Sequence, residues 1–358
     1  MSDKKDIVLS VKDLEVKFKV RDKELTALRN ISLDFEEGKV VAIVGESGSG
    51  KSVFTKTFTG MLENNGRISN GEIWFEGQNL VEITKDKDWE KIRGKKIATI
   101  FQDPMTSLNP VRTIGYQISE VIIKHQGKSK EEAKELAIEL MSRVGIKDAA
   151  NRYDEYPFMY SGGMRQRIVI AIALACRPKI LVCDEPTTAL DVTIQAQIIN
   201  LIKELSQEYG FTTIYITHDL GVVANVADTV AVMYAGQIVE IGTVEEIFYE
   251  PLHPYTWGLL SSLPQLGEKG DALFAIRGTP PSLFNKIQGD AFAPRSDYAM
   301  EIDFEEEPPM FQASETHFAK TWLLDERAPK VEKPEIIRNL HEKMISLTSK
   351  GGVYSDRN

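Results

Sequence analysis

The sequence predicts an α/β fold whose core sheet is mostly parallel. Two apolar runs rich in β-branched residues, VVAIV at 40–44 and ILVC at 180–183, have the composition of buried parallel strands. Each run leads through a turn into a helical segment, and a third run, TTIYIT at 212–217, continues the alternation. Strands that alternate with helices in this way are typical of a parallel sheet covered by helices.

The segments before and beside this core predict a second, antiparallel sheet. Residues 7–18, IVLSVKDLEVKF, and residues 31–35, ISLDF, alternate between apolar and polar side chains, as short half-buried strands do. The stretch GEIWFEG at 71–77 alternates in the same way, whereas KIATIF at 96–101 has the composition of a further core strand.

Between about residue 105 and residue 175 the pattern becomes helical. In the segment 129–145 apolar residues recur at helical spacing, at Ala133, Leu136, Ala137, Leu140, Met141 and Val144. Ser129 and Glu132 form a capping box at its start, and Gly145 suits its C-terminal cap. We expect this helix to belong to a separate helical lobe.

The C-terminal third has a different composition. VAVMYAGQIVEIG predicts a hairpin that turns at Gly236, and after about residue 253 prolines become frequent and an acidic run, EIDFEEEPP, appears. We therefore divide the chain into a first domain at 1–253, with the helical lobe at about 105–175, an appended domain at 254–335 and a charged tail at 336–358.

Charge and composition exclude several classes of protein. There are 43 Lys and Arg residues against 53 Asp and Glu, which gives a net charge of −10 and disfavours general nucleic-acid binding. The cysteines, Cys176 and Cys183, lie in apolar runs and are expected to be buried, reduced thiols. The sequence shows neither a secretory signal nor about 18 consecutive apolar residues, so work at a membrane would require docking onto other chains.

A glycine-rich motif follows the first core strand. Residues 45–52, GESGSGKS, match the pattern G-x-x-x-x-G-K-S between a strand and a helix. In this pattern backbone amides surround phosphate oxygens, Lys51 reaches the β- and γ-phosphates, and the Ser52 hydroxyl binds Mg²⁺. A flexible glycine loop is the alternative. The predicted phosphate-binding residues are Gly45, Glu46, Ser47, Gly48, Ser49, Gly50, Lys51, Ser52 and Val53.

A pair of carboxylates ends another core strand. In ILVCDEP, at 180–186, Asp184 is placed to hold Mg²⁺ and Glu185 to polarise an attacking water. On its own an Asp-Glu pair is more often a solvated strand end. Together with the upstream phosphate loop, it indicates a site for nucleotide hydrolysis.

A third motif, YSGGMRQR at 160–167, opens an apolar helix and places Ser161, Gly162 and Gly163 at a helix N-terminus, where backbone donors attract anions. The phosphate loop, SGG before a helix, the DE strand end, TTALD and ITHD follow one another here in the order found in ABC-type ATPases. From residue 8 to about residue 250 the chain resembles that family.

This resemblance implies the P-loop nucleotide-binding fold of ABC proteins and further roles. Gln102 in IFQDP resembles the glutamine that senses Mg²⁺ and links the site to a membrane partner. Asp191 of TTALD resembles a residue of the dimer interface, and His218 of ITHD resembles the switch histidine that touches the γ-phosphate. Phe18 falls where the family places an aromatic ring on adenine. The alternatives are a core residue for Phe18 and a hydrogen-bonded strand end for His218.

Two features place the chain within a subfamily. Met164 stands where many relatives have Gln, a form shared by the ATPase subunits of oligopeptide and dipeptide importers. HPYTWGLLSSLP and IRGTPPSL resemble the C-terminal extension of these subunits, specifically of the D-type ATPase of oligopeptide importers, so the resemblance reaches about residue 325.

The extension departs from its relatives at one point. Many of them carry four cysteines that hold an iron-sulfur cluster, and alignment places Asp290, Ser296, Asp303 and Lys320 at those positions. Without thiolates we predict no cluster. The carboxylates form either a solvated acidic loop, which we favour, or a site for a hard cation.

The resemblance also implies cofactors and partners. We expect ATP and Mg²⁺, a head-to-tail pair with a second ATPase subunit, favoured as a heterodimer, two transmembrane permease subunits and an extracytoplasmic peptide-binding protein. The expected location is the cytoplasmic face of the bacterial cell membrane. Alternatives are an importer of another small solute, such as dipeptide or nickel, an ABC ATPase acting on nucleic acid or the ribosome, and a regulatory subunit that binds ATP without hydrolysing it.

Overall fold

The computed structural model describes residues 6–102, 104–187, 190–263 and 275–340. The chain forms two compact units built from interleaved segments. The first unit comprises Met1–Leu14, Ser32–Ala42 and Ser52–Thr217, and the second comprises Glu15–Ile31, Ile43–Lys51 and His218–Asn358. Residues 188–189 of the TTALD segment and the tail after residue 340 lie outside the described residues.

The core of the first unit is the predicted parallel sheet. Strands β6 (Ile97–Ile100), β7 (Ile180–Asp184) and β8 (Thr212–Thr217) pair in parallel, with Ile97 opposite Ile180 and Ile180 opposite Thr212. The first residues of β3 (Val40–Val44) lie beside β8, which gives the order β3-β8-β7-β6. Every residue of β3 and β8 is buried, as the apolar composition predicts.

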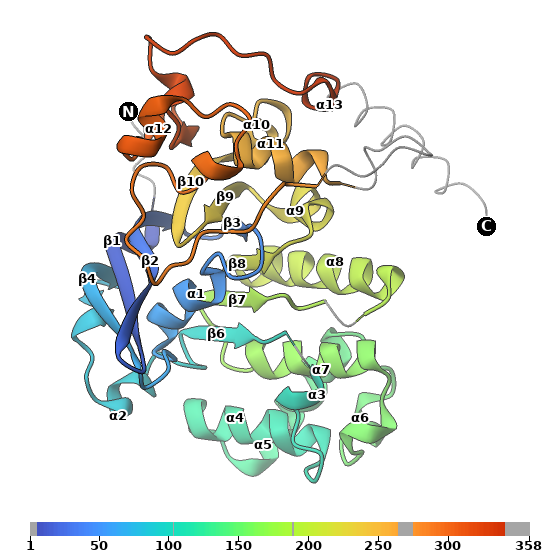
Figure 1. The fold of residues 1–358 in the computed structure, drawn as a ribbon. Coiled ribbons are helices and arrows are strands. Elements are labelled where there is room, and N and C mark those ends of the chain that lie inside the picture. Colours follow the sequence, from blue (N-terminus) through green and yellow to red (C-terminus); the bar gives the residue numbers. More distant parts are fainter. Residues whose placement is uncertain (1–5, 103, 188–189, 264–274, 341–358) are drawn as a thin grey trace, which may run out of the picture. The chain divides into compact units, whose positions relative to one another are not determined.

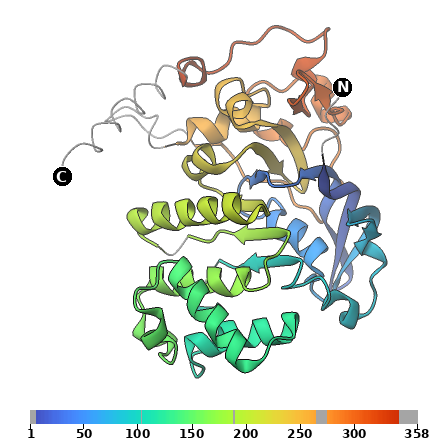
Figure 2. The ribbon, with the colours of Figure 1, turned by 180° about the vertical axis from the view of Figure 1, so that it is seen from behind.

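Helices surround this sheet in the first unit. Helix α8 (Val192–Tyr209) is the helical segment expected after the run at 180–183, and it ends at Gly210, which is left-handed. Helices α3 to α7 gather in one group, drawn in green in both views (Figures 1 and 2). The bounds of this group are α3 Pro104–Ser107, α4 Ile114–Gln126, α5 Lys130–Arg143, α6 Ala149–Arg152 and α7 Gly162–Leu174, with the 3-10 helix η2 at Pro157–Met159.

The predicted capping box of α5 is confirmed. Ser129 Oγ accepts from the Glu132 amide at 3.2 Å, and the Glu132 carboxylate accepts from the Ser129 amide at 2.9 Å. Gly145 follows the helix with a φ of +85°, and its amide donates to the Ser142 carbonyl. Both helix ends are thus satisfied by the residues that the sequence indicated.

A second sheet of four strands has the order β2-β1-β4-β5. Its strands are β1 (Ile7–Val20), β2 (Lys23–Glu36), β4 (Gly66–Phe75) and β5 (Gln78–Asn79). β1 and β2 each run for 14 residues, so the expectation of short strands is wrong. The remaining elements of this region are α1 Lys51–Thr59, η1 Leu80–Glu82 and α2 Asp86–Trp89.

The second unit contains the predicted hairpin. Strands β9 (Thr229–Tyr234) and β10 (Gln237–Thr243) pair antiparallel across Ala235 and Gly236, which both have positive φ as a tight hairpin requires. β10 pairs with β12 (Phe318–Ala319), and β12 with β11 (Phe311–Gln312). Its helices are α9 Leu220–Val226, α10 Val244–Tyr249, α11 Pro254–Ser261, η4 Ala293–Arg295, α12 Glu301–Glu305, η5 Trp322–Leu324 and α13 Glu335–Arg338.

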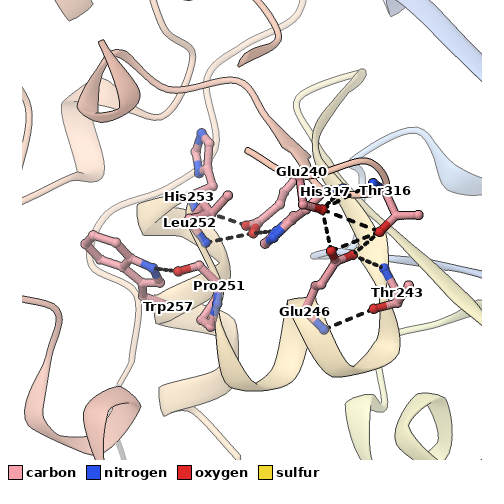
Figure 3. A network of polar contacts seen from close by, with 10 residues as sticks. Glu240, Thr243, Glu246, Pro251, Leu252, His253, Trp257, Thr316 and His317 are labelled. Carbon is pink, nitrogen blue, oxygen red and sulfur yellow. Dashed lines mark hydrogen bonds and ion pairs between the residues drawn. The ribbon is translucent and has the colours of Figure 1, made fainter. Parts of the chain in front are cut away.

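A buried carboxylate ties these elements together. Glu240 of β10 has no exposed surface and accepts hydrogen bonds from the backbone amides of Leu252 and His253 and from His317 Nε2, at 2.7, 3.0 and 2.8 Å (Figure 3). His317 immediately precedes β12. One side chain therefore joins β10 to the segment before α11 and to the C-terminal strands.

Two expectations need correction. The acidic run is not a solvated loop, because residues 301–305 form α12 and Asp303 is buried. Cys183 is buried within β7 as expected, but Cys176, two residues past the end of α7, is only half-buried. Both thiols are free.

Candidate functional site

The phosphate loop leaves β3 at Gly45 and enters α1 at Lys51, within the second unit. Gly45 and Gly50 have φ of +152° and +104°. A Cβ atom on Gly45 would lie 2.1 Å from the Met233 carbonyl oxygen, so a side chain does not fit there. The glycines are therefore required by the path of the backbone, which passes directly over β9.

Lys51 lies inside this loop. Its side chain is buried, and Nζ donates to the carbonyl oxygens of Gly45 and Glu46 at 2.8 and 2.9 Å. The nearby Ser49 hydroxyl is buried and has no hydrogen-bond partner among the described residues. A buried ammonium and a buried hydroxyl without a partner suit an anionic ligand with several oxygen atoms.

The first unit by itself brings together two of the predicted metal ligands. Ser52, in the first turn of α1, places its hydroxyl 3.2 Å from the Asp184 carboxylate at the end of β7. Hydroxyl and carboxylate oxygens are ligands that Mg²⁺ prefers. The pair therefore fits the predicted metal position.

Glu185 and Gln102 meet beside this pair. They follow the neighbouring parallel strands β7 and β6, whose carboxyl ends lie at one edge of the sheet. Gln102 Nε2 donates to the Glu185 carboxylate at 2.9 Å. Glu185 has a φ of +46°, which costs about 1 kcal/mol or more for a residue other than glycine. Its amide donates to the Ile216 carbonyl of β8, and this bond fixes the strained conformation.

The SGG motif begins α7 as predicted. Ser161 caps the helix, with Oγ accepting from the Met164 amide at 3.4 Å. A Cβ on Gly163 would lie 2.6 Å from the Ile194 side chain of α8, so this glycine allows the two helices to approach closely. Ser161 and Gly162 are exposed, which leaves the helix N-terminus open to a ligand or a partner.

Three further residues predicted to belong to the nucleotide site lie on other elements. Asp191 is exposed and caps α8 by accepting from the Ile194 amide at 3.0 Å. His218 follows β8, is exposed and belongs to the second unit. Phe18 on β1 is only 8% exposed, as expected for a core residue. Its stacking role stays a prediction.

Two residues of the C-terminal region contact the phosphate loop, and the sequence did not indicate this. Tyr255 Oη accepts from the Glu46 amide at 2.8 Å, and Arg295 forms a two-point ion pair with the Glu46 carboxylate. Burial raises the pKa of Tyr255, so its hydroxyl stays neutral. Tyr255 lies within HPYTWG, but no local pattern marks Arg295.

The four residues predicted to stand in place of cysteines make ordinary contacts. Asp290 and Ser296 accept from the amides of Phe292 and Tyr298, two residues further along the chain. Asp303 accepts from the Met300 amide at 2.7 Å, and Lys320 pairs with Glu307. Burial raises the pKa of Asp303. Within the described part of the chain no group of three or more His, Cys, Asp or Glu residues is arranged to hold a metal ion.

Comparison with known families gives two matches. The profile described as ABC transporter matches residues 28–188, and the profile described as the C-terminal region of oligopeptide/dipeptide transporters matches residues 239–302. The second match includes Tyr255 and Arg295. Across the described ranges, none of the helices is long and apolar enough to cross a bilayer.

Individual proteins are similar over nearly the whole chain. The oligopeptide transport ATP-binding protein AmiE of Streptococcus pneumoniae is 69% identical, covering 96% of this chain and 97% of its own. The dipeptide transport ATP-binding protein DppD of Lactococcus lactis subsp. cremoris is 59% identical, covering 90% and 93%.

Solved structures of similar fold are ATP-binding cassettes. A dimeric cassette in a post-hydrolysis state, bound to ADP and Pi, is 29% identical with a TM-score of 0.59, over 66% of this chain and 98% of that one. A component of an ABC transporter complex from Clostridium perfringens is 29% identical with a TM-score of 0.60, over 68% and 92%.

Proposed function

The chain belongs to the ABC transporter family, in its oligopeptide/dipeptide branch, and we propose that it is the ATP-hydrolysing subunit that powers an oligopeptide importer. The identity to AmiE over almost the full length supports oligopeptide as the solute. The match of the C-terminal profile supports the same branch independently of the ATPase motifs.

One observation carries the proposal. At the edge of the core sheet, Ser52 and Asp184 offer oxygen ligands 3.2 Å apart, while Gln102 holds the Glu185 carboxylate at 2.9 Å. This is the arrangement needed for a metal-bound triphosphate with a carboxylate beside it that orients water. It also argues against a subunit that only binds ATP, because the carboxylate is present and positioned.

The residues of the chain divide the work of hydrolysis. Lys51 exchanges its bonds to the Gly45 and Glu46 carbonyls for the β- and γ-phosphates. Glu185 accepts a proton from the attacking water, and Gln102 keeps its carboxylate oriented. Mg²⁺, when held by Ser52 and Asp184, neutralises phosphate charge. His218 contacts the γ-phosphate, and Phe18 stacks on adenine.

A second ATPase subunit completes the site in this proposal. The exposed N-terminus of α7 at Ser161, Gly162 and Gly163 presents backbone donors that would cover the nucleotide of the partner, with Asp191 at the same interface. A cassette of similar fold forms a dimer in its ADP-bound structure, which supports pairing. We favour a heterodimer with a related ATPase. ATP then drives closure through its higher affinity for the closed pair.

The helical lobe supplies a surface for the permease subunits. Tyr156 and Phe158 stack with ring centroids 5.7 Å apart, and the side chains of Phe158 and Met159 are 70% and 55% exposed. Exposed aromatic pairs of this kind are frequent in protein interfaces. We propose that two transmembrane subunits dock here and hold the chain at the cytoplasmic face of the membrane, and that they receive peptide from an extracytoplasmic binding protein.

A second candidate solute is dipeptide. The relative from Lactococcus lactis is a dipeptide transport protein and shares 59% identity with this chain. Uptake of labelled dipeptide and of longer peptides by cells that lack this subunit, with and without the restored gene, separates the two candidates.

The catalytic assignment is tested by substituting Glu185→Gln. The amide has nearly the same shape but accepts no proton, so we expect ATP binding to persist while turnover falls by at least about 100-fold, the usual weight of a general base. ATP affinity and phosphate release are measured on the assembled transporter, with Lys51→Ala as the control that loses binding. Hydrolysis by Glu185→Gln at a rate near wild type would exclude the proposed role.

A further inference from the structure

The second residue of the phosphate loop is held by the C-terminal extension. Arg295 Nη1 and Nη2 lie 2.6 and 3.0 Å from the two carboxylate oxygens of Glu46. The Arg295 side chain is 4% exposed and that of Glu46 29%, so the ion pair is largely shielded from water. Two parallel bonds between guanidinium and carboxylate fix orientation as well as charge.

The extension itself holds the guanidinium in place. Arg295 Nε donates to the Arg277 carbonyl at 2.8 Å, and Nη2 also approaches the Ile276 and Gly278 carbonyls at 3.4 Å. Nη1 further donates to Tyr234 Oη at 3.2 Å. Because every nitrogen of the guanidinium has an acceptor, Arg295 is a fixed anchor and not a mobile surface charge.

The backbone of Glu46 has an anchor of its own. Its amide donates to Tyr255 Oη, and its carbonyl, like that of Gly45, accepts from Lys51 Nζ. When Lys51 turns to a triphosphate, the two carbonyl bonds are given up. The Ser49 amide still donates to the Glu46 carbonyl within the loop, and the anchors of Glu46 from outside the loop are Tyr255 and Arg295, both in the extension.

Charge gives Arg295 a second effect. A carboxylate in a loop that binds a triphosphate repels the ligand unless it is neutralised. Arg295 supplies the compensating charge from outside the loop.

We propose that Arg295 is a positioning residue for the ATP site. By clamping Glu46, with Tyr255 on the backbone amide, the extension sets the affinity of the phosphate loop for ATP. This inference rests on the proposed function of the loop. It assigns to the extension a role in nucleotide binding that does not depend on the four cysteine positions.

The test compares Arg295→Met with wild type in the assembled transporter. Loss of a charge-assisted pair raises the KM for ATP roughly tenfold, with kcat at saturating ATP within about twofold of wild type. Arg295→Lys keeps the positive charge but loses the two-point geometry, so its KM lies between that of wild type and that of Arg295→Met. In Glu46→Gln/Arg295→Met the KM returns towards that of Glu46→Gln alone, since no unpaired carboxylate is left.

Arg327→Met is the matched control. Arg327 is an arginine of the same extension that pairs with Asp325, two residues away, and is exposed. Its KM and thermal stability are expected to equal those of wild type. If Arg295→Met does not fold, Arg295→Lys and Tyr255→Phe decide the question, because each retains most of the side-chain volume.

The outcomes are distinct. An unchanged KM for Arg295→Met, or a loss of stability and kcat with unchanged KM, overturns the inference, because a merely structural arginine behaves in that way. If wild type binds ATP and Lys51→Ala does not, such a result leaves the proposed function intact. If wild type itself binds no ATP, the proposed function fails, and this inference fails with it.

Discussion

Cys176 and Cys183 lie only seven positions apart yet have different surroundings. Cys183 is buried in β7, one residue before Asp184. Its pKa is raised mainly by burial and to a smaller extent by the neighbouring Asp184 carboxylate. Cys176 is half-buried, with Sγ 3.9 Å from the Val121 carbonyl, and burial raises its pKa to about 11. Since the thiolate is the reactive form, a raised pKa makes both residues poor nucleophiles at neutral pH.

The rate of alkylation by iodoacetamide at pH 8 measures the reactivity of the two thiols. A pKa raised from 9.0 to about 11 lowers the thiolate fraction of Cys176 about 100-fold, so we expect labelling of the native chain to be slower by a similar factor than that of a free thiol. In urea both cysteines react readily. The variant Cys176→Ser, the control, shows no slow native phase. Rapid labelling of one thiol in the native wild type would contradict this prediction.

Among single residues, those that could be identified from the sequence stand in short motifs of neighbouring residues. Lys51, Ser52, Asp184 and Ser161 stand in short motifs whose geometry is set by the next few residues of the chain, and the structure places them at the expected strand and helix ends. Arg295 and Glu46 are 249 positions apart in the sequence, and no pattern in the segment FAPRSD around Arg295 predicts their contact. Long-range ion pairs of this kind become visible only when the chain is folded.

At the scale of elements, predictions succeeded where periodicity and caps agreed. The start of α5 follows the sequence closely, because apolar spacing and a capping residue indicate the same boundary. The prediction of a solvated loop at the acidic run 301–307 was wrong, because it assumed that every charged side chain there faces solvent. Asp303 is instead buried and accepts a hydrogen bond from the Met300 amide. The predicted strand at 31–35 covers only the end of β2, because Lys23–Asn30 shows no regular alternation of apolar and polar residues.

Helix α10 gives a pH prediction. Glu246 accepts from the Thr243 amide at 2.8 Å and from the Thr316 hydroxyl at 2.9 Å (Figure 3). It also accepts from the Ser314 hydroxyl at 2.5 Å. Burial by itself would raise the pKa of Glu246, but these hydrogen bonds outweigh it and lower the pKa below its ordinary value of 4.5. A lowered pKa in the folded state stabilises the fold above about pH 4.5, and this contribution is lost as the pH falls through the folded value.

We therefore expect Glu246→Gln to reduce the free energy of unfolding by about 1 kcal/mol at pH 7, the usual weight of capping bonds, and the deficit to shrink below pH 4.5. Thermal unfolding at several pH values between 3.5 and 7 measures it. Glu245→Gln, an exposed change on the same turn, is the control and should leave stability nearly unchanged. A deficit of constant size at every pH would count against the assignment.

At the scale of the whole molecule, the negative charge determines which partners are attracted. A net charge of −10 produces a field that repels phosphate backbones. The two compact units are built from interleaved segments, an arrangement that no local pattern reveals because it depends on contacts between distant parts of the chain. The contiguous domain ranges inferred from the sequence stay a prediction.

The negative net charge predicts that the protein does not bind nucleic acid. We expect duplex DNA, single-stranded DNA and RNA to leave both the electrophoretic mobility of the protein and its ATPase rate unchanged at about 0.15 M salt, because binding of this kind relies on Lys and Arg contacts to phosphates. A basic protein of similar size serves as the positive control for retardation. Stimulated hydrolysis in the presence of any of these polymers would favour the nucleic-acid alternative instead.

The ion pair between Glu46 and Arg295 also has a consequence for biosynthesis. Translation runs at about 5–20 residues per second, so roughly 10 to 50 s separate the synthesis of the loop from that of its clamp. On the proposal above, a growing polypeptide on the ribosome displays the glycine motif long before it gains full affinity for nucleotide. Newly made subunits thus bind ATP more weakly until the extension has been translated.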